Sequence, residues 1–262
     1  MKRIALLSAL IMVAVVAGCA GVSREAAQSA EQPVSQQTAT SDIQLRAKVH
    51  TELGSLYMQR GNMGVALEEA RAALSADADY APAHSLMGLV YMQLHENVAA
   101  EKSFEQALSL APGDPETNNS YGWFLCQTGR EQRSLQYFQK AIKSPLYATP
   151  AMPYANAGIC SLRLKDDKAA EEYFTKALRL DATNNQAIFF LADIAFRHDR
   201  LAEARQRLAE LQAESSPESL WLAVRIERKA GDRDAEARYS SLLRRKFSGS
   251  PEQLKLMQGR YE

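Results

Sequence analysis

The chain has 262 residues, of which 31 are basic (Lys and Arg) and 31 are acidic (Asp and Glu), so its formal net charge is zero. A nucleic-acid-binding surface would show as a surplus of basic residues, and this balance argues against one. If Lys2 and Arg3 are removed with a leader, 29 basic residues remain against 31 acidic ones, a net charge of −2, and the conclusion is unchanged.

Residues 1–18 have the organisation of a secretion signal. Lys2 and Arg3 precede an apolar stretch that runs from Ile4 to Ala17. A helix of these residues would be roughly 21 Å long, which is short of the ~30 Å hydrocarbon core that a spanning helix must cross. The stretch therefore predicts a cleaved signal peptide and not a permanent membrane anchor.

The sequence Val16-Ala17-Gly18-Cys19 resembles the lipobox of bacterial lipoproteins. The resemblance implies that Cys19 receives a diacylglycerol, becomes the first residue of the mature chain and is N-acylated. Several acyl chains hold a protein on a bilayer, because each buried CH₂ contributes about 0.8 kcal/mol. Ala20 stands where an Asp would signal inner-membrane retention, so the resemblance implies a lipid-anchored protein of the outer membrane that faces the periplasm. The alternative is an ordinary secretory signal, in which Cys19 has no such role.

Residues 19–41 are expected to form the lipidated cysteine and a flexible tether. Residues 22–41 contain only two large aliphatic residues and no aromatic residue. Such a segment cannot bury enough surface to offset the entropy cost of ordering it. A flexible chain of about 20 residues has an rms span near 25 Å, so the tether would let the folded part reach away from the lipid surface.

A repeat with a period of 34 residues follows the tether. Gly54, Gly88 and Gly122 are 34 residues apart, Gly158 follows after 36, and Ala192 follows after another 34. Each of these small residues is followed by a polar break and then by a second helical stretch. One helical pair cannot bury its apolar face alone, so three or more pairs must stack. The period therefore predicts a solenoid of helical hairpins.

This pattern resembles the tetratricopeptide repeat, in which one helical pair occupies 34 residues. In the second repeat the signature positions hold Gly88, Tyr91, Ala100, Phe104, Ala107 and Pro112. The resemblance implies an all-α, right-handed superhelical solenoid over residues 42–262. About six repeats are expected, near residues 47–80, 81–114, 115–150, 151–184, 185–216 and 217–250.

The small residue at the eighth position of each repeat is interpreted as a site where the two helices of a pair approach closely. The matching small surface on the second helix is expected from Ala66, Ala100, Ala170 and Ala204. Larger side chains are expected to fill the gap to the next pair, namely Phe104, Phe138 and Phe174. The sixth repeat is degenerate, as expected of a terminal repeat whose outer face meets water.

The concave wall of such a solenoid is formed by the first helix of each pair, and here its positions are mostly apolar. An apolar groove favours an amphipathic helix or an extended hydrophobic segment of a partner. Repeats that clamp a carboxylate use Asn, Lys and Arg at these positions, and only Asn119 matches. The candidate groove residues are Met58, Leu89, Met92, Asn119, Trp123, Ile159, Leu162, Phe189 and Phe196. Trp123 and Phe189 are the expected anchors, because large aromatic residues dominate interface energies. The alternative is that these side chains pack between repeats and face no partner.

No catalytic or metal-binding residue is predicted. The four histidines lack the spacing of metal ligands, and His50 and His84 fall at a position where packing is the default role. HExxH, a phosphate-binding glycine loop and a nucleophile elbow are absent from the sequence. We therefore expect no enzymatic activity, no metal, no cofactor and no small-molecule substrate, the lipid on Cys19 being the expected covalent group.

Two cysteines remain besides Cys19, in a compartment that is oxidising. Cys126 and Cys160 lie on the first helices of adjacent repeats, at the twelfth and tenth positions. An offset of two residues rotates a side chain by about 200°, so one can point forward and the other backward, toward each other. A disulfide is predicted, with two buried thiols as the alternative, and a Cα separation under ~7 Å decides between them.

The lipobox, the tether and the repeats, together with NNSYGWFLCQTGR (118–130) and EEYFTKALRLD (171–181), resemble the lipoproteins of type IV pilus biogenesis known as pilotins. The resemblance implies an outer-membrane scaffold that binds the pilus secretin subunit and promotes its localisation and multimerisation. Other pilus assembly proteins are further expected partners, the membrane is reached through the lipid, and nucleic acid is not a partner. The alternative is an outer-membrane repeat lipoprotein that organises cell-wall synthases or hydrolases.

Overall fold

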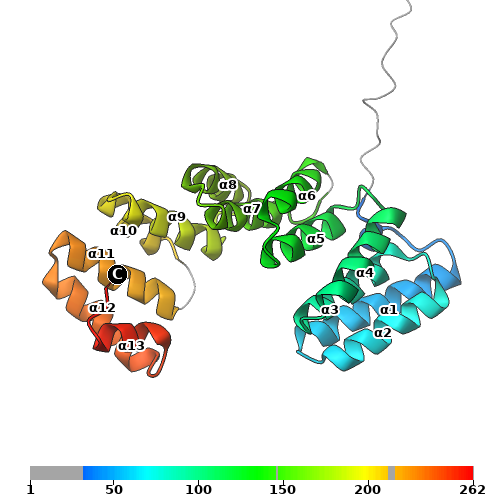
Figure 1. The fold of residues 1–262 in the computed structure, drawn as a ribbon, viewed down its shortest axis with the longest axis horizontal. Coiled ribbons are helices and arrows are strands. Elements are labelled where there is room, and N and C mark those ends of the chain that lie inside the picture. Colours follow the sequence, from blue (N-terminus) through cyan, green and yellow to red (C-terminus); the bar gives the residue numbers. More distant parts are fainter. Residues whose placement is uncertain (1–31, 146, 212–215, 262) are drawn as a thin grey trace, which may run out of the picture. The chain divides into compact units, whose positions relative to one another are not determined.

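The computed structural model describes residues 32–145, 147–211 and 216–261. The predicted signal peptide, Cys19 and the first part of the expected tether lie outside the described residues. All regular structure in the described part of the chain is helical (Figure 1). None of the helices described is both long enough and apolar enough to cross a membrane.

The helices form six successive hairpins, each of which packs on the next, followed by one short helix. A 3₁₀ turn, η1 (Val34–Gln36), precedes them. The helices are α1 (Asp42–Gln59), α2 (Met63–Ala76), α3 (Ala81–Gln93), α4 (Asn97–Leu110), α5 (Pro115–Gln127), α6 (Glu131–Lys143), α7 (Ala151–Arg163), α8 (Asp167–Leu180), α9 (Asn185–Arg197), α10 (Leu201–Ala209), α11 (Pro217–Ala230), α12 (Arg233–Lys246) and α13 (Pro251–Met257).

The helix starts follow local signals in the sequence. From the second hairpin on, the first helices begin at residues 81, 115, 151, 185 and 217, where the sequence placed the repeats. At α5 the Asp114 carboxylate accepts the backbone N–H of Thr117 at 2.8 Å, and Pro115 occupies the first helical position, where no N–H is needed. Ser41 caps α1, so the first helix begins at Asp42, where the solenoid was expected to start, and extends five residues ahead of the first repeat near residue 47.

Phenylalanine rings make the close approach to the glycines at the eighth position. A Cβ on Gly88 would lie 2.8 Å from the ring of Phe104, and a Cβ on Gly158 would lie 2.7 Å from the ring of Phe174. The expected close approach is confirmed, but at Gly88, Gly122 and Gly158 the partner is a ring, whereas a Cβ on Gly54 would meet Leu86 at 2.7 Å and the expected Ala66, through its carbonyl oxygen, at 3.2 Å. The same rings contact the next hairpin, as predicted: the Phe104 and Tyr121 ring centroids are 5.6 Å apart.

Residues 33–37, which were expected to belong to the flexible tether, are bound to the hairpins. Val34 packs against a core cluster that contains Tyr80, and its backbone N–H donates to Asp114 Oδ1 at 3.1 Å. Two other side chains of this segment donate to the Glu116 carboxylate at 2.5 and 3.2 Å. The expectation was wrong here because an apolar site of the first and second hairpins and two carboxylates at the start of α5 hold the segment. We call residues 33–37 the strap.

Candidate partner-binding face

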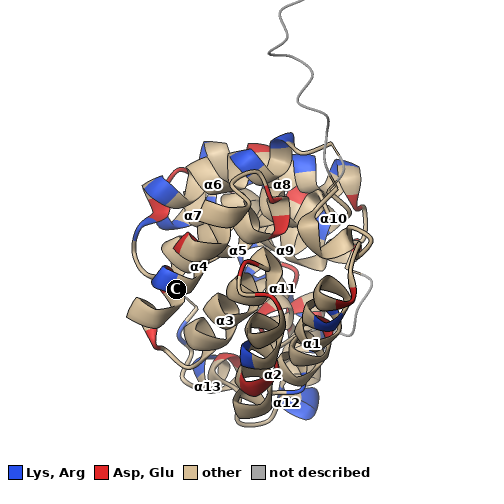
Figure 2. Ribbon diagram, turned by 90° about the vertical axis from the view of Figure 1, so that its right-hand side faces the viewer, with Lys and Arg blue, Asp and Glu red and all other residues tan. Residues whose placement is uncertain are grey.

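The first helices of the second, third and fourth hairpins carry few charged residues. α3 has none, α5 has only Glu116 and α7 has only Arg163. The second helices α4, α6 and α8 carry several each, as the blue and red residues on α6 and α8 in Figure 2 show. Six of the nine candidate residues lie on these three helices, Met58 lies on α1, and Phe189 and Phe196 lie on α9. We call the surface that the nine residues form the candidate face.

Most of the candidate face is half-buried. Leu89 and Met92 pack against the core cluster of Phe104, and Ile159 and Leu162 pack against that of Phe174. The half-buried members are Met58, Leu89, Met92, Trp123, Ile159, Leu162 and Phe189. Each of these side chains therefore divides its surface between packing within the repeats and solvent.

Asn119 and Phe196 are buried, with 6% and 8% of their surface exposed. The amide of Asn156 donates to Asn119 Oδ1 at 3.0 Å. The Phe196 ring lies under two cations of the sixth hairpin, Arg225 at 4.6 Å and Lys229 at 5.5 Å from its centroid. These two members of the candidate face consequently have little surface of their own to offer a partner.

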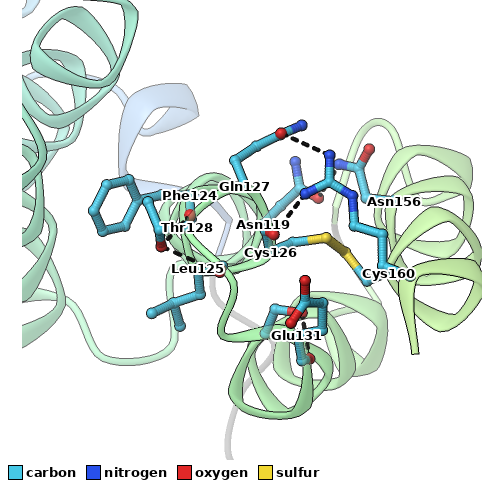
Figure 3. Close-up of a disulfide and its surroundings, with 11 residues drawn as sticks. Asn119, Phe124, Leu125, Cys126, Gln127, Thr128, Glu131, Asn156 and Cys160 are labelled. Atoms are coloured by element: carbon cyan, nitrogen blue, oxygen red, sulfur yellow. Dashed lines mark hydrogen bonds between the residues drawn. A yellow bond between two sulfur atoms is a disulfide. The ribbon is translucent and has the colours of Figure 1, made fainter. Parts of the chain in front are cut away.

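A disulfide joins Cys126 on α5 to Cys160 on α7, and the two Cα atoms are 5.9 Å apart (Figure 3). The alternative of two buried thiols is therefore not what the structure contains. Arg163 donates to the carbonyl oxygen of Cys126 and to Gln127 Oε1, both at 2.7 Å. Trp123 packs against the core cluster that holds both cysteines. The centre of the candidate face is thus cross-linked between two adjacent hairpins.

Two of the histidines, His50 and His84, are engaged in ordinary local contacts. Nδ1 of His50 lies 2.7 Å from a carboxylate oxygen of Glu69, and Nε2 of His84 lies 2.9 Å from the carbonyl oxygen of Ala78. Among the described residues, no three His, Cys, Asp or Glu side chains gather where they could hold a metal ion. The expected packing role of these two histidines becomes a hydrogen-bonding role near the surface.

Sequence reasoning missed two aromatic residues of the sixth hairpin region. Trp221 stands at the fifth position of its repeat, equivalent to Asn119 and Phe189, so the 34-residue register could have identified it. Tyr261 lies beyond the repeats, and no sequence signal marks it. Its ring stacks on that of Trp221 with centroids 5.5 Å apart.

Comparison with known proteins agrees with this architecture. Residues 84–206 and residues 47–80 match the tetratricopeptide repeat. The type IV pilus assembly protein PilF of Pseudomonas aeruginosa is 31% identical over 206 residues, which cover 78% of this chain and 81% of PilF. The solved structure of P. aeruginosa PilF matches with a TM-score of 0.76 at 28% identity, over 84% of this chain and all of the other. PilW, a widely conserved type IV pilus biogenesis factor, matches with a TM-score of 0.74 at 30% identity, over 80% of this chain and 98% of the other.

Proposed function

This chain belongs to the tetratricopeptide-repeat family of type IV pilus biogenesis proteins that includes PilF and PilW, and we propose that it is the pilotin of its pilus system. In this proposal it is an outer-membrane lipoprotein that binds the pilus secretin subunit and promotes its localisation and multimerisation. Family membership supports the role in pilus biogenesis, and the candidate face supports a mechanism based on protein–protein binding.

The surroundings of Trp123 are the observation that carries the mechanism. This half-buried indole lies on the sparsely charged α5, beside the disulfide that holds α5 against α7. A partner segment that covers the exposed part of the indole and its apolar neighbours gains burial without desolvating charges. The Asn156 amide, which donates to Asn119 on the same helix as Trp123, can both donate and accept hydrogen bonds, which suits the backbone of an extended segment.

The lipid on Cys19 would supply the membrane address, and the chain between Cys19 and the strap would supply reach. Replacing Cys19 by Ala should leave a folded protein that no longer fractionates with the outer membrane, because several acyl chains are needed for stable anchoring. Outer-membrane fractionation of this variant at the wild-type level would contradict the lipoprotein part of the proposal.

The first experiment is an immunoblot of the secretin from membranes of a strain that lacks this gene, run without boiling so that assembled rings remain intact. Loss of the ring with monomer still present would support the proposed role. Intact rings in the outer membrane, with altered cell shape or lysis and normal pili, would contradict it and favour a scaffold for cell-wall enzymes.

The matching point test is Trp123→Ala in the full chain, with Tyr137→Ala as its control. Tyr137 is also a half-buried aromatic residue of the third hairpin, but it lies on the second helix, α6. Trp123→Ala should reduce ring assembly at least fivefold while circular dichroism stays native, and Tyr137→Ala should leave assembly unchanged. A folded Trp123→Ala protein that supports normal assembly would show that the candidate face is not the binding surface.

A further inference from the structure

Three side chains of α11 hold a tyrosine from outside the repeats. The Tyr261 ring stacks on Trp221, with centroids 5.5 Å apart and planes 23° apart. The guanidinium carbon of Arg228 lies 3.8 Å from the centroid of the same ring. Nε of Arg225 donates to the backbone carbonyl oxygen of Tyr261 at 3.1 Å. A ring and its backbone are therefore bound together, as a short peptide ligand would be.

A local chain reversal brings Tyr261 to α11. α13 ends at Met257, and Gly259 adopts φ +64°, a left-handed conformation that glycine tolerates without strain. The backbone N–H of Arg260 then donates to the carbonyl oxygen of Lys255 at 3.0 Å. The side chains of residues 258–260 are exposed, so this backbone hydrogen bond and the contacts of Tyr261 hold the tail in place.

The bound tyrosine occupies the end of the candidate face. Trp221, Arg225 and Arg228 stand at the fifth, ninth and twelfth positions of the sixth repeat, the positions that define the candidate face in the other repeats. Arg225 also covers the ring of Phe196, a member of that face, at 4.6 Å. The tyrosine site and the candidate face are thus continuous through Arg225.

We propose that Trp221, Arg225 and Arg228 form a subsite for an aromatic side chain of a partner polypeptide, and that Tyr261 occupies this subsite in the free protein. The guanidinium of Arg225 has no ion pair with a carboxylate among the described residues, so an acidic residue next to the partner's aromatic residue complements the subsite. The partner segment displaces Tyr261 when it binds. This inference extends the proposed function, because the subsite lies at the end of the same face.

The test uses the full mature chain labelled with ¹⁵N and the peptide QGRYE, which reproduces residues 258–262. The chain has two tryptophans, so the indole N–H of Trp221 reports the subsite and that of Trp123 serves as an internal control. In Tyr261→Ala, the peptide should shift the Trp221 resonance at a concentration about tenfold lower than in the wild type. In the wild type Tyr261 fills the site, so the apparent affinity for the peptide is reduced to the fraction of molecules in which the site is open. The Trp123 resonance should not move.

Four controls isolate the contacts. The peptide QGRAE should not shift Trp221, and Arg225→Gln in the Tyr261→Ala background should weaken binding of QGRYE several-fold. Tyr261→Phe keeps the ring and should behave as the wild type, which separates loss of the ring from loosening of α13. Arg245→Gln, on the exposed side of α12, should have no effect if the general basic charge is not responsible.

Equal titration of the wild type and Tyr261→Ala, or no shift of Trp221 with millimolar peptide in either protein, would overturn the inference. A Trp221 resonance that moves on dilution of the wild type would overturn the assignment of Tyr261 to its own chain and indicate exchange between two copies. The secretin is absent from these titrations, so a negative result here leaves the Trp123→Ala assembly test unaffected, and the converse also holds.

Discussion

At the scale of single residues, the clearest constraint is the contact, in the second, third and fourth hairpins, between a glycine of the first helix and a phenylalanine of the second. Phe104 is fully buried and touches both Gly88 and the next hairpin, so its ring has no free space into which to move. Gly88→Ala should lower the free energy of unfolding by about 1–3 kcal/mol, because an added methyl overpacks a filled core. Urea denaturation measures the change.

Gly64 supplies the matched control for this prediction. It lies in α2, and a Cβ built there meets nothing within 4 Å. Gly64→Ala should therefore not lower the free energy of unfolding. It should raise it by as much as about 1 kcal/mol, since alanine is the better helix former. If Gly88→Ala proves as stable as Gly64→Ala, the close approach does not determine the geometry of the hairpin.

Ionisation of the Tyr80 hydroxyl should lower the free energy of unfolding at alkaline pH. Burial, followed by the nearby carboxylates of Glu52 and Asp77, raises the pKa of Tyr80 to about 12 from an ordinary value near 10. Between pH 10 and pH 12 the folded protein keeps a proton that the unfolded chain releases, so the stabilisation is fully present below pH 10 and is lost as the pH rises toward 12. Over this interval the loss from Tyr80 should be roughly 1–3 kcal/mol.

The Tyr80→Phe variant isolates this contribution. It cannot ionise, so its free energy of unfolding should fall less steeply than that of the wild type between pH 10 and pH 12. At pH 7 the two proteins should differ little, which controls for packing. Parallel pH dependence of the two proteins in urea denaturation would show that Tyr80 does not titrate as described.

At the scale of helices, the disulfide between α5 and α7 makes the third and fourth hairpins one cross-linked unit. The bond closes a loop of 34 residues. In the chain-entropy account, cross-linking a loop of this length stabilises the fold by about 4 kcal/mol. Replacing both Cys126 and Cys160 by Ala should therefore lower the free energy of unfolding by up to that amount, measured by urea denaturation under oxidising conditions.

The reduced wild-type protein provides the comparison. Dithiothreitol should bring its unfolding midpoint close to that of the double-alanine variant and should leave the variant unchanged. A double-alanine variant as stable as the oxidised wild type would mean that the packing of Trp123 and Phe138 around the bond is sufficient by itself.

At the scale of the whole molecule, the strap determines where the chain that leads to Cys19 leaves the repeats. The Glu116 carboxylate accepts two hydrogen bonds from strap side chains, so Glu116→Ala should loosen the strap without unfolding α5. Each such bond contributes about 1 kcal/mol, so loss of both should make amide hydrogen exchange in residues 33–37 up to roughly thirtyfold faster.

Glu218→Ala is the control for the strap. Glu218 holds the same place in the first turn of α11 as Glu116 does in α5, but it is exposed. It should leave exchange in residues 33–37 unchanged. Equal exchange in this segment for Glu116→Ala and the wild type would indicate that Val34 and Asp114 hold the strap without Glu116.

The sequence by itself determined the repeated architecture. Helix starts, the glycine of close approach and the pairing of Cys126 with Cys160 all follow from a period that recurs every 34 residues, and each needs only local or neighbouring-repeat information. The tertiary structure alone decided how the two ends of the repeats are covered. The bond from Val34 to Asp114 joins residues 80 positions apart, and that from Arg225 to Tyr261 joins residues 36 positions apart, without any periodicity. Such contacts depend on where the chain folds back after the hairpins have stacked, and for that reason Tyr261, the strap and the burial of Phe196 could not be predicted from the residue pattern.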